Sequence, residues 1–262
     1  MGQSGRYFNV TVKPAISVAA LASGDITDTQ ILFDWHGFDI PKGAARLIGM
    51  TVLYTGKNGA DYAPTDFELF WGKANADGTA PITMGDDGAV VDTFGWFPNI
   101  IGKSYIDASD FKNDGDLIMG NVLVPNTHGG TNTAAGTTNM GYPNSQIVLE
   151  GVPNSGSNVG YDKIYVSAIA KATHNWGASE MECGTGLAIT SPVLAVTDLD
   201  PRLSGVGPGD VLRDEDDNLL GTVKTVDSAT QMTMEDNLGN ASAAGKLVYN
   251  TSPITLVLSF ER

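Results

Sequence analysis

Short runs rich in Val, Ile, Leu, Phe, Tyr and Thr follow one another along the chain, separated by turns that hold most of the 32 glycines and 12 prolines. This pattern is typical of a strand-rich protein, and no long helix is predicted. The clearest alternation covers residues 66–71. Phe67, Leu69 and Trp71 share one face there and the acids take the other, which predicts a half-buried strand. Residues 46–54 are apolar on both faces, which predicts a central strand.

The remaining apolar runs predict further strands in the main part of the chain. They are Tyr7–Val12, Ala15–Leu21, Gln30–Trp35 with a continuation towards Ile40, Leu117–Pro125, Gln146–Leu149, Asp162–Lys171, Thr185–Thr190 and Ile254–Phe260. Between residues 73 and 115 the pattern is weaker. Ala89–Phe94 and Trp96–Ile101 hold enough apolar residues to pack, Asp107–Lys112 fits a short helix, and the polar segment His128–Gly141 is predicted to be an exposed loop.

Strands at these spacings indicate an all-β protein whose body is an antiparallel β-sandwich, jelly-roll-like. A second pattern interrupts it near the C-terminus, with short strands predicted at Asp210–Arg213, Leu219–Val226, Gln231–Glu235 and Lys246–Tyr249. We therefore expect a discontinuous body, residues 1–195 plus 251–262, and an inserted small SH3-like β-barrel module, residues 196–250. Residues 207–250 hold eight acidic and three basic residues, so this module should face outward.

Charge and composition narrow the classes of function. Thirty acidic and fifteen basic residues give a net charge of −15, which opposes binding to nucleic acid because few cations are available to replace counterions. Cys183 is the only cysteine, so an internal disulfide is excluded. We expect no membrane span and no export signal, and Gly2 fails as a myristoylation site because Arg6 stands where Ser or Thr is needed.

The acidic run at residues 214–218 offers the oxygen ligands that calcium prefers. The EF-hand pattern fails, because Leu219 occupies the glycine position and Thr225 the bidentate glutamate position. A solvated hairpin tip is the favoured interpretation, and cation binding there stays open. Asp86 and Asp87 are paired carboxylates, and a solvated turn is favoured for them over a glycosidase pair.

Three histidines, His36, His128 and His174, lie in unrelated contexts and none pairs with another at metal-ligand spacing. His36 is expected to be structural, and a nucleophile pair of Cys183 with His174 is considered but disfavoured. We expect no catalytic residue, no cofactor and no metal. An aromatic sugar platform of Trp71, Trp96, Trp176 and Tyr161 is an alternative, although packing explains the first two better. For a tail or fibre component that recognises a host surface, the candidate residues are Tyr142, Tyr161 and Trp176.

Two groups of segments carry a resemblance to a known family. Residues 209–234 contain a Gly-Asp start, an acidic turn, Leu-Gly-Thr-Val and Val-Asp-Ser-Ala-Thr-Gln, and they resemble a small β module of tailed-phage virion proteins. Phe38–Gly49, Phe67–Phe70 and Thr251–Glu261 are similar to segments of structural proteins from marine tailed phages. Together these segments cover about half of the chain.

The resemblance implies a non-enzymatic virion structural protein. Within that class we expect a capsid decoration or cement protein, a homotrimer that binds the outer surface of the major capsid protein lattice and stabilises the head. It would be made in the host cytoplasm and would lie on the capsid exterior. The alternatives are a phage tail or fibre component and a carbohydrate-binding module that recognises a host surface. The resemblance assigns no capsid-binding residues.

Overall fold

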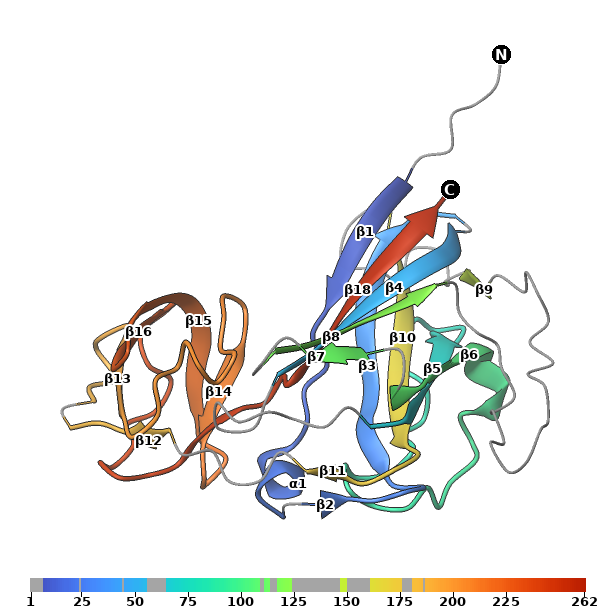
Figure 1. Ribbon diagram of the computed structural model, residues 1–262. Coiled ribbons are helices and arrows are strands. Elements are labelled where there is room, and N and C mark those ends of the chain that lie inside the picture. Colours follow the sequence, from blue (N-terminus) through green and yellow to red (C-terminus); the bar gives the residue numbers. More distant parts are fainter. Residues whose placement is uncertain are drawn as a thin grey trace.

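The protein is described from a computed structural model that covers residues 7–23, 25–43, 45–55, 65–108, 111–113, 117–123, 147–149, 161–175, 181–185 and 187–262. The fold is all-β and its sheets are antiparallel. Figure 1 shows a larger body, with a smaller unit beside it that the chain enters and leaves late in the sequence. The predicted loop His128–Gly141 lies outside the described residues.

Two sheets form the body. The first has the order β1-β18-β4-β8-β7, with β9 also paired to β4, and the second has the order β3-β10-β5-β6. The strands of the first sheet are β1 (Tyr7–Val12), β4 (Ala45–Thr55), β7 (Phe111–Asn113), β8 (Leu117–Leu123), β9 (Ile147–Leu149) and β18 (Ile254–Glu261). The strands of the second are β3 (Ile31–Pro41), β5 (Phe67–Lys73), β6 (Ile100–Ile106) and β10 (Tyr161–Ala170).

Both sheets contribute to one hydrophobic core, so they pack face to face. Alternation places the inward residues: along β18, every second side chain from Ile254 to Phe260 is buried. β4 is central, as predicted, since it pairs with β18 on one side and with β8 and β9 on the other. A register shift opposite Ser259 and Phe260 changes which alternate residues of β4 point inward, and this explains why both alternations of its sequence are apolar. Leu47 is buried before the shift, and Met50 is buried after it.

Three predicted elements are wrong. Residues 13–17 have no regular structure and Val18–Ser23 form a short helix, α1, where a strand was expected; the Ser17 hydroxyl accepts the Ala20 N–H at 3.3 Å and caps the helix. The helix expected at residues 107–112 is wrong at its C-terminal end, where Phe111 and Lys112 belong to strand β7 and pair with β8; residues 109–110 lie outside the described residues. Residues 187–190 form a turn, and the strand lies earlier, at Glu182–Cys183 (β12).

The outer face of the second sheet is covered by the long connection between β5 and β6. Ala89–Phe94 is not a strand; an isolated bridge joins Val90 to Gln30, and a single turn of 3-10 helix, η1 (Phe97–Asn99), precedes β6. Trp96 and Met84 from this connection form a second core with Ile31 and Ile169. A two-stranded pair, β2 (Asp25–Ile26) with β11 (His174–Asn175), lies near α1 at the lower end of the body in Figure 1.

The small unit is a sheet with the order β12-β13-β16-β15-β14-β17. Besides β12, its strands are β13 (Val193–Thr197), β14 (Val211–Asp214), β15 (Leu219–Ser228), β16 (Gln231–Met234) and β17 (Val248–Asn250). All four predicted module strands are therefore present, with small differences at their ends. Two further strands belong to this sheet: β12 lies on the body side of the boundary expected at 195/196, and β13 spans that boundary.

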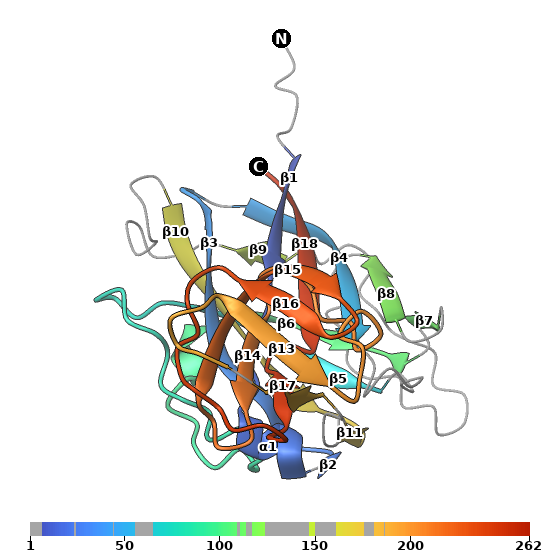
Figure 2. The same ribbon diagram turned by 90° about the vertical axis from the view of Figure 1, so that its left-hand side faces the viewer.

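Twelve buried residues, which include Cys183, Leu194 and Met232, form a hydrophobic core of the small unit's own. The strand order is an open path, and no closed barrel is found among these strands. The two edge strands are nevertheless joined by an isolated bridge between Glu182 and Leu247 and by a 2.8 Å hydrogen bond from the Val248 N–H to the Met181 carbonyl. Figure 2, which looks onto the small unit, shows these strands in front of the body.

Candidate functional site

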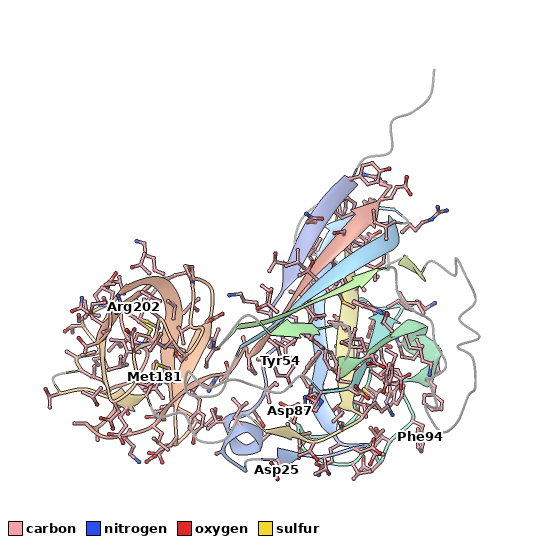
Figure 3. The ribbon with its side chains drawn as sticks, in the orientation of Figure 1. Asp25, Tyr54, Asp87, Phe94, Met181 and Arg202 are labelled. Atoms are coloured by element: carbon pink, nitrogen blue, oxygen red, sulfur yellow. The ribbon has the colours of Figure 1, made fainter. Side chains whose placement is uncertain are left out.

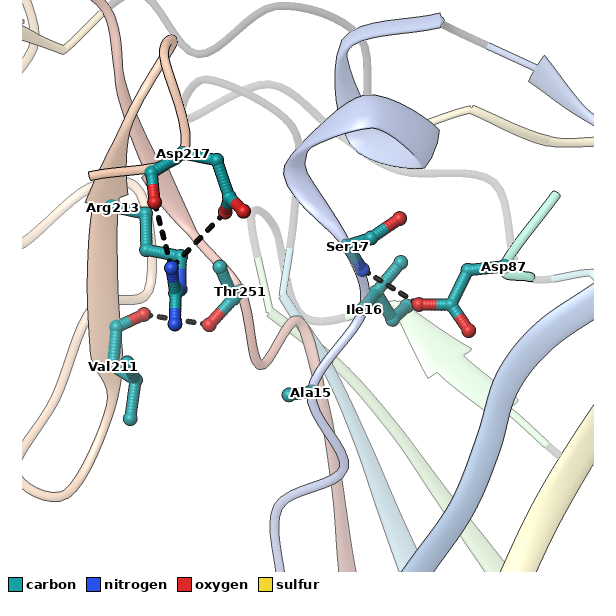
Figure 4. Close-up of a pocket in the computed structure, with 8 residues that line it drawn as sticks. All are labelled: Ala15, Ile16, Ser17, Asp87, Val211, Arg213, Asp217 and Thr251. Atoms are coloured by element: carbon teal, nitrogen blue, oxygen red, sulfur yellow. Dashed lines mark hydrogen bonds and ion pairs between the residues drawn. The ribbon is translucent and has the colours of Figure 1, made fainter. Parts of the chain in front are cut away.

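A pocket of about 330 Å³ lies where the small unit meets the body. The segment before α1 forms one wall. Strand β14, the turn after it and the start of the β17–β18 connection form the other (Figure 4). The lining residues are Ala15, Ile16, Ser17, Asp87, Val211, Arg213, Asp217 and Thr251. The pocket thus combines an apolar floor with three charged side chains from segments far apart in the sequence.

Backbone hydrogen bonds hold the two walls of the pocket in place. The Ile16 N–H donates to the Thr251 carbonyl at 2.7 Å, and both the N–H and the hydroxyl of Thr251 donate to the Val211 carbonyl, at 3.0 and 2.9 Å. Thr251 and Ser252 are buried, as few polar residues of this protein are. The N-terminal segment is therefore packed along the chain that links the small unit to β18.

An ion pair fastens the same junction. The Lys13 ammonium lies 2.6 Å from the Asp210 carboxylate and also donates to the Pro208 carbonyl at 2.9 Å. The Asp210 side chain is 4% exposed, and it accepts two more hydrogen bonds, from the Gly207 N–H and the Asn250 amide, both at 2.9 Å. A nearly buried carboxylate with these partners is strongly tied to its position.

Asp87 is the titratable group of the pocket. Its two oxygens accept hydrogen bonds from the backbone N–H groups of Ser17 (2.7 Å) and Asp34 (3.1 Å). Burial raises the pKa of Asp87 to about 6, although these two hydrogen bonds favour its charged form. Asp87 is therefore not the solvated turn residue that the sequence favoured; it joins the β5–β6 connection to the segment before α1 and to β3.

The Arg213 guanidinium donates to the backbone carbonyl of Asp217 at 2.7 Å and to its carboxylate at 3.2 Å (Figure 4). The two charged groups on the small-unit side are thus paired with each other, and Asp87 on the opposite side is held by backbone groups. The arrangement fixes the relative position of the body and the small unit. Its chemistry is that of a structural junction.

The acidic run 214–218 is organised around one buried side chain. The Asp214 carboxylate accepts hydrogen bonds from the N–H of Asp216, the N–H and amide of Asn218 and the hydroxyl of Ser242, at 2.8–3.1 Å. Burial opposes ionisation, but the hydrogen bonds keep the pKa of Asp214 below its ordinary value. The neighbouring Glu215 and Asp216 contact the Lys246 ammonium, at 2.7 and 2.9 Å. Among the residues that the structure describes, no three His, Cys, Asp or Glu side chains are grouped so as to hold a metal ion.

His174 and Cys183 belong to different cores. His174 is fully buried in the body, where its Nδ1 contacts the hydroxyls of Tyr54 and Thr65 and its Nε2 lies 3.0 Å from the Asp66 carbonyl. Cys183 packs in the core of the small unit, and burial raises the pKa of its thiol. A thiol with a raised pKa is a poor nucleophile.

His36 is half-buried on β3, where burial and the nearby Lys163 lower its pKa. His128, Tyr142, Trp176 and the side chain of Tyr161 lie outside the described part of the chain. Trp71 is fully buried in the core between the two sheets, and Trp96 is 3% exposed in the second core, on the outer face of the second sheet. Neither ring is therefore available to a sugar. No described helix is long and apolar enough to cross a membrane.

Exposed apolar side chains gather on the connection between β5 and β6. Ile82, Phe94 and Phe97 are 55%, 61% and 56% exposed, and we call these three residues the aromatic patch. Phe94 and Phe97 were missed because Ala89–Phe94 and Trp96–Ile101 were interpreted as packing segments. Pro81, Gly95 and Pro98 are the signal that could have corrected this, since such residues interrupt strands and turn side chains outward.

No protein-family model and no curated protein matches the sequence. Among solved structures, the chain is similar to the infectious bursal disease virus VP2 subviral particle, with 11% sequence identity and a TM-score of 0.17. The match covers 98% of this chain and 41% of the VP2 chain, so this chain spans less than half the length of that protein. A TM-score this low carries no argument about fold or function.

Proposed function

We propose that the body is a jelly roll and that the protein is a non-enzymatic structural component of a virion, a capsid decoration or cement protein. The observation that carries the proposal is the order of strand pairing. Counted along the chain, the eight main strands of the body are β1, β3, β4, β5, β6, β8, β10 and β18. The first, eighth, third and sixth pair in one sheet, and the second, seventh, fourth and fifth pair in the other. Two Greek keys wound in this order make a jelly roll, a fold of viral capsid and lectin domains.

In this proposal the small unit is a module inserted between the seventh and eighth strands. Its separate core supports the division, and the bridge between its edge strands supports a small barrel-like shape. The resemblance of residues 209–234 to a module of tailed-phage virion proteins supports the same assignment. The ion pair of Lys13 with Asp210 fits a part that must keep its orientation on a lattice.

The proposed partner is the major capsid protein, and the proposed location is the outer surface of the capsid. The net charge of −15 disfavours an interior position against the genome, because like charges repel across short distances. The proposed assembly is a homotrimer, which would add multivalent attachment to a lattice. Neither catalysis nor a cofactor is part of the proposal.

A mixing experiment tests the decoration role. Purified protein is incubated with capsids that lack it, and the capsids are pelleted. We expect the protein in the pellet at a fixed ratio to the capsid subunits, because a repeated lattice offers a repeated site. Persistent absence from the pellet would refute the decoration role. Light scattering at several concentrations tests the trimer, which a monodisperse monomer would contradict.

The second candidate is a tail or fibre component, or a carbohydrate-binding module, that recognises a host surface. The exposed rings of Phe94 and Phe97 are the observation in its favour, since aromatic faces stack on sugars, and lectin domains also use the jelly roll. Incubation with host cells and host polysaccharide separates the two candidates. Binding there, without binding to capsids, would support the second one.

A further inference from the structure

The aromatic patch of Ile82, Phe94 and Phe97 is a concentrated group of exposed apolar side chains on the body. Single exposed apolar residues are ordinary on protein surfaces. Here the exposed side chains gather: the rings of Phe94 and Phe97 are 5.1 Å apart between centroids, and Ile82 lies so close to Gly95, the residue after Phe94, that a Cβ there would meet Ile82 Cδ1 at 3.0 Å. The patch is therefore a continuous apolar surface, of the kind that marks interaction sites.

The patch is held rigidly from below. Trp96, between the two phenylalanines, is buried and packs edge-on against Trp35 and Phe70, with ring centroids 6.1 and 5.7 Å apart. The Trp35 indole N–H donates to the Ile82 carbonyl at 3.0 Å, and the Trp96 indole N–H donates to the Thr93 carbonyl at 2.7 Å. Rigid display of apolar side chains lowers the entropy lost on binding. The connection thus presents its exposed rings in one fixed arrangement.

The segment that carries the patch is acidic. Residues 74–99 contain four aspartates and no lysine or arginine, and Asp86 and Asp92 are exposed. A partner that buries the apolar side chains would bring its own rim towards Asp92, which lies two residues before Phe94. Complementary potentials favour a rim of Lys and Arg. An isologous contact through the patch would instead bring two copies of the exposed Asp92 to one interface.

The patch also lies away from the small unit. In Figure 3, Phe94 is at the outer side of the body, and Met181 and Arg202 of the small unit are at the opposite side. A partner could therefore contact the patch without displacing the small unit from its junction with the body.

We propose that the aromatic patch is the surface through which the protein docks on a protein partner, and that this partner offers an apolar depression rimmed by lysines and arginines. This inference rests on the proposed function, in which the partner is the capsid subunit. Phe94 and Phe97 are the anchors that enter the depression, since aromatic residues at the centre of an interface dominate its energy. Asp92, which is exposed and lies two residues before Phe94, is at the rim and guides the approach.

The test measures binding to capsids that lack the protein. Phe94→Ser/Phe97→Ser is compared with wild type and with Ile189→Ser/Leu203→Ser, a control whose residues are 55% and 52% exposed and belong to the small-unit end of the chain. We expect the patch variant to lose at least about 30-fold in affinity, as anchor residues do. The control should bind as wild type does. Thermal melting and circular dichroism check that each variant is folded.

A second pair of variants needs no change in the apolar side chains. Asp92→Lys reverses a rim charge, and Asp236→Lys makes the same change at an exposed aspartate of the small unit. We expect Asp92→Lys to weaken binding and to slow association, and Asp236→Lys to leave both unchanged. Wild-type affinity should fall as the salt concentration rises, because the rim attraction is screened.

The outcomes separate the inference from the proposed function. If wild type does not bind capsids, both fail. If wild type binds and the patch variant and Asp92→Lys bind equally well, the inference is overturned and the decoration role stands. It is likewise overturned if the patch variant binds capsids normally but no longer self-associates or no longer binds host polysaccharide.

Discussion

Replacing His174 with glutamine tests how a buried histidine sets the acid sensitivity of the body. Its Nε2–H donates to the Asp66 carbonyl, so its Nδ1 is left to accept from the hydroxyls of Tyr54 and Thr65. A proton on Nδ1 would remove the acceptor of these two hydroxyls and would place a charge in a site with no exposure to water. Burial accordingly lowers the pKa of His174 to about 4, from an ordinary value of 6.5.

The direction and size of the effect follow from this pKa. Between pH 6.5 and pH 4 the unfolded chain binds a proton at His174 that the folded protein does not, so the free energy of unfolding falls as the pH falls through this window. The difference between the two pKa values corresponds to a loss of about 3 kcal/mol. Above the unfolded pKa the contribution is fully present.

His174→Gln removes the titration and also the buried hydrogen bonds, which costs about 1–3 kcal/mol near neutral pH. The measurement is denaturant unfolding followed by tryptophan fluorescence at several pH values. On acidification we expect the unfolding free energy of wild type to fall by about 3 kcal/mol relative to that of the variant, so that the advantage of wild type at neutral pH is lost or reversed. His36→Gln is the control, and it should change the slope less because His36 is only half-buried. Parallel wild-type and His174→Gln curves would refute the reasoning.

Three further predictions concern the junction. The raised pKa of Asp87 makes the unfolding free energy of wild type fall by at most about 3 kcal/mol as the pH rises from 4 to about 6, the opposite direction to the effect of His174. Asp87→Asn should remove this fall, and unfolding curves at these pH values measure it. Lys13→Met should cost about 2 kcal/mol, less than for a fully buried pair because the Lys13 side chain is 27% exposed, and should speed limited proteolysis near Asp210; unchanged cleavage would contradict it. Replacement of residues 181–250 by a short Gly/Ser linker should leave the body folded and able to pellet with capsids, since the two cores are separate; a body that no longer folds would count against the division into two units.

The strands with regular alternation could be predicted from the sequence. β5, β18 and the four predicted strands of the small unit all occur where apolar residues recur at a period of two or where short runs lie between turn residues. The strand predicted at Ala15–Leu21 was the main failure, because this Ala-rich stretch has no period that separates a short helix from a strand.

The candidate site was less accessible to prediction. Asp87 interacts with Ser17 and Asp34, and Lys13 with Asp210, across separations of 53 to 197 residues, and nothing local in the sequence marks such pairs. Asp87, Lys13 and Asp210 come together at the junction only because the chain returns from the small unit to the body at Thr251.

By itself, then, the sequence determined the all-β class, most of the strands and the acidic surface, because alternation and charge are properties of short segments. Only the tertiary structure decided which faces are covered. Glu68 alternates outward on β5, yet it is 8% exposed and its carboxylate contacts Lys103 at 2.7 Å, and the connection that follows β5 covers the same sheet. The strand order was also decided there, since β1 pairs with β18 at the far end of the chain, and contacts between such distant segments depend on the packing of the whole fold.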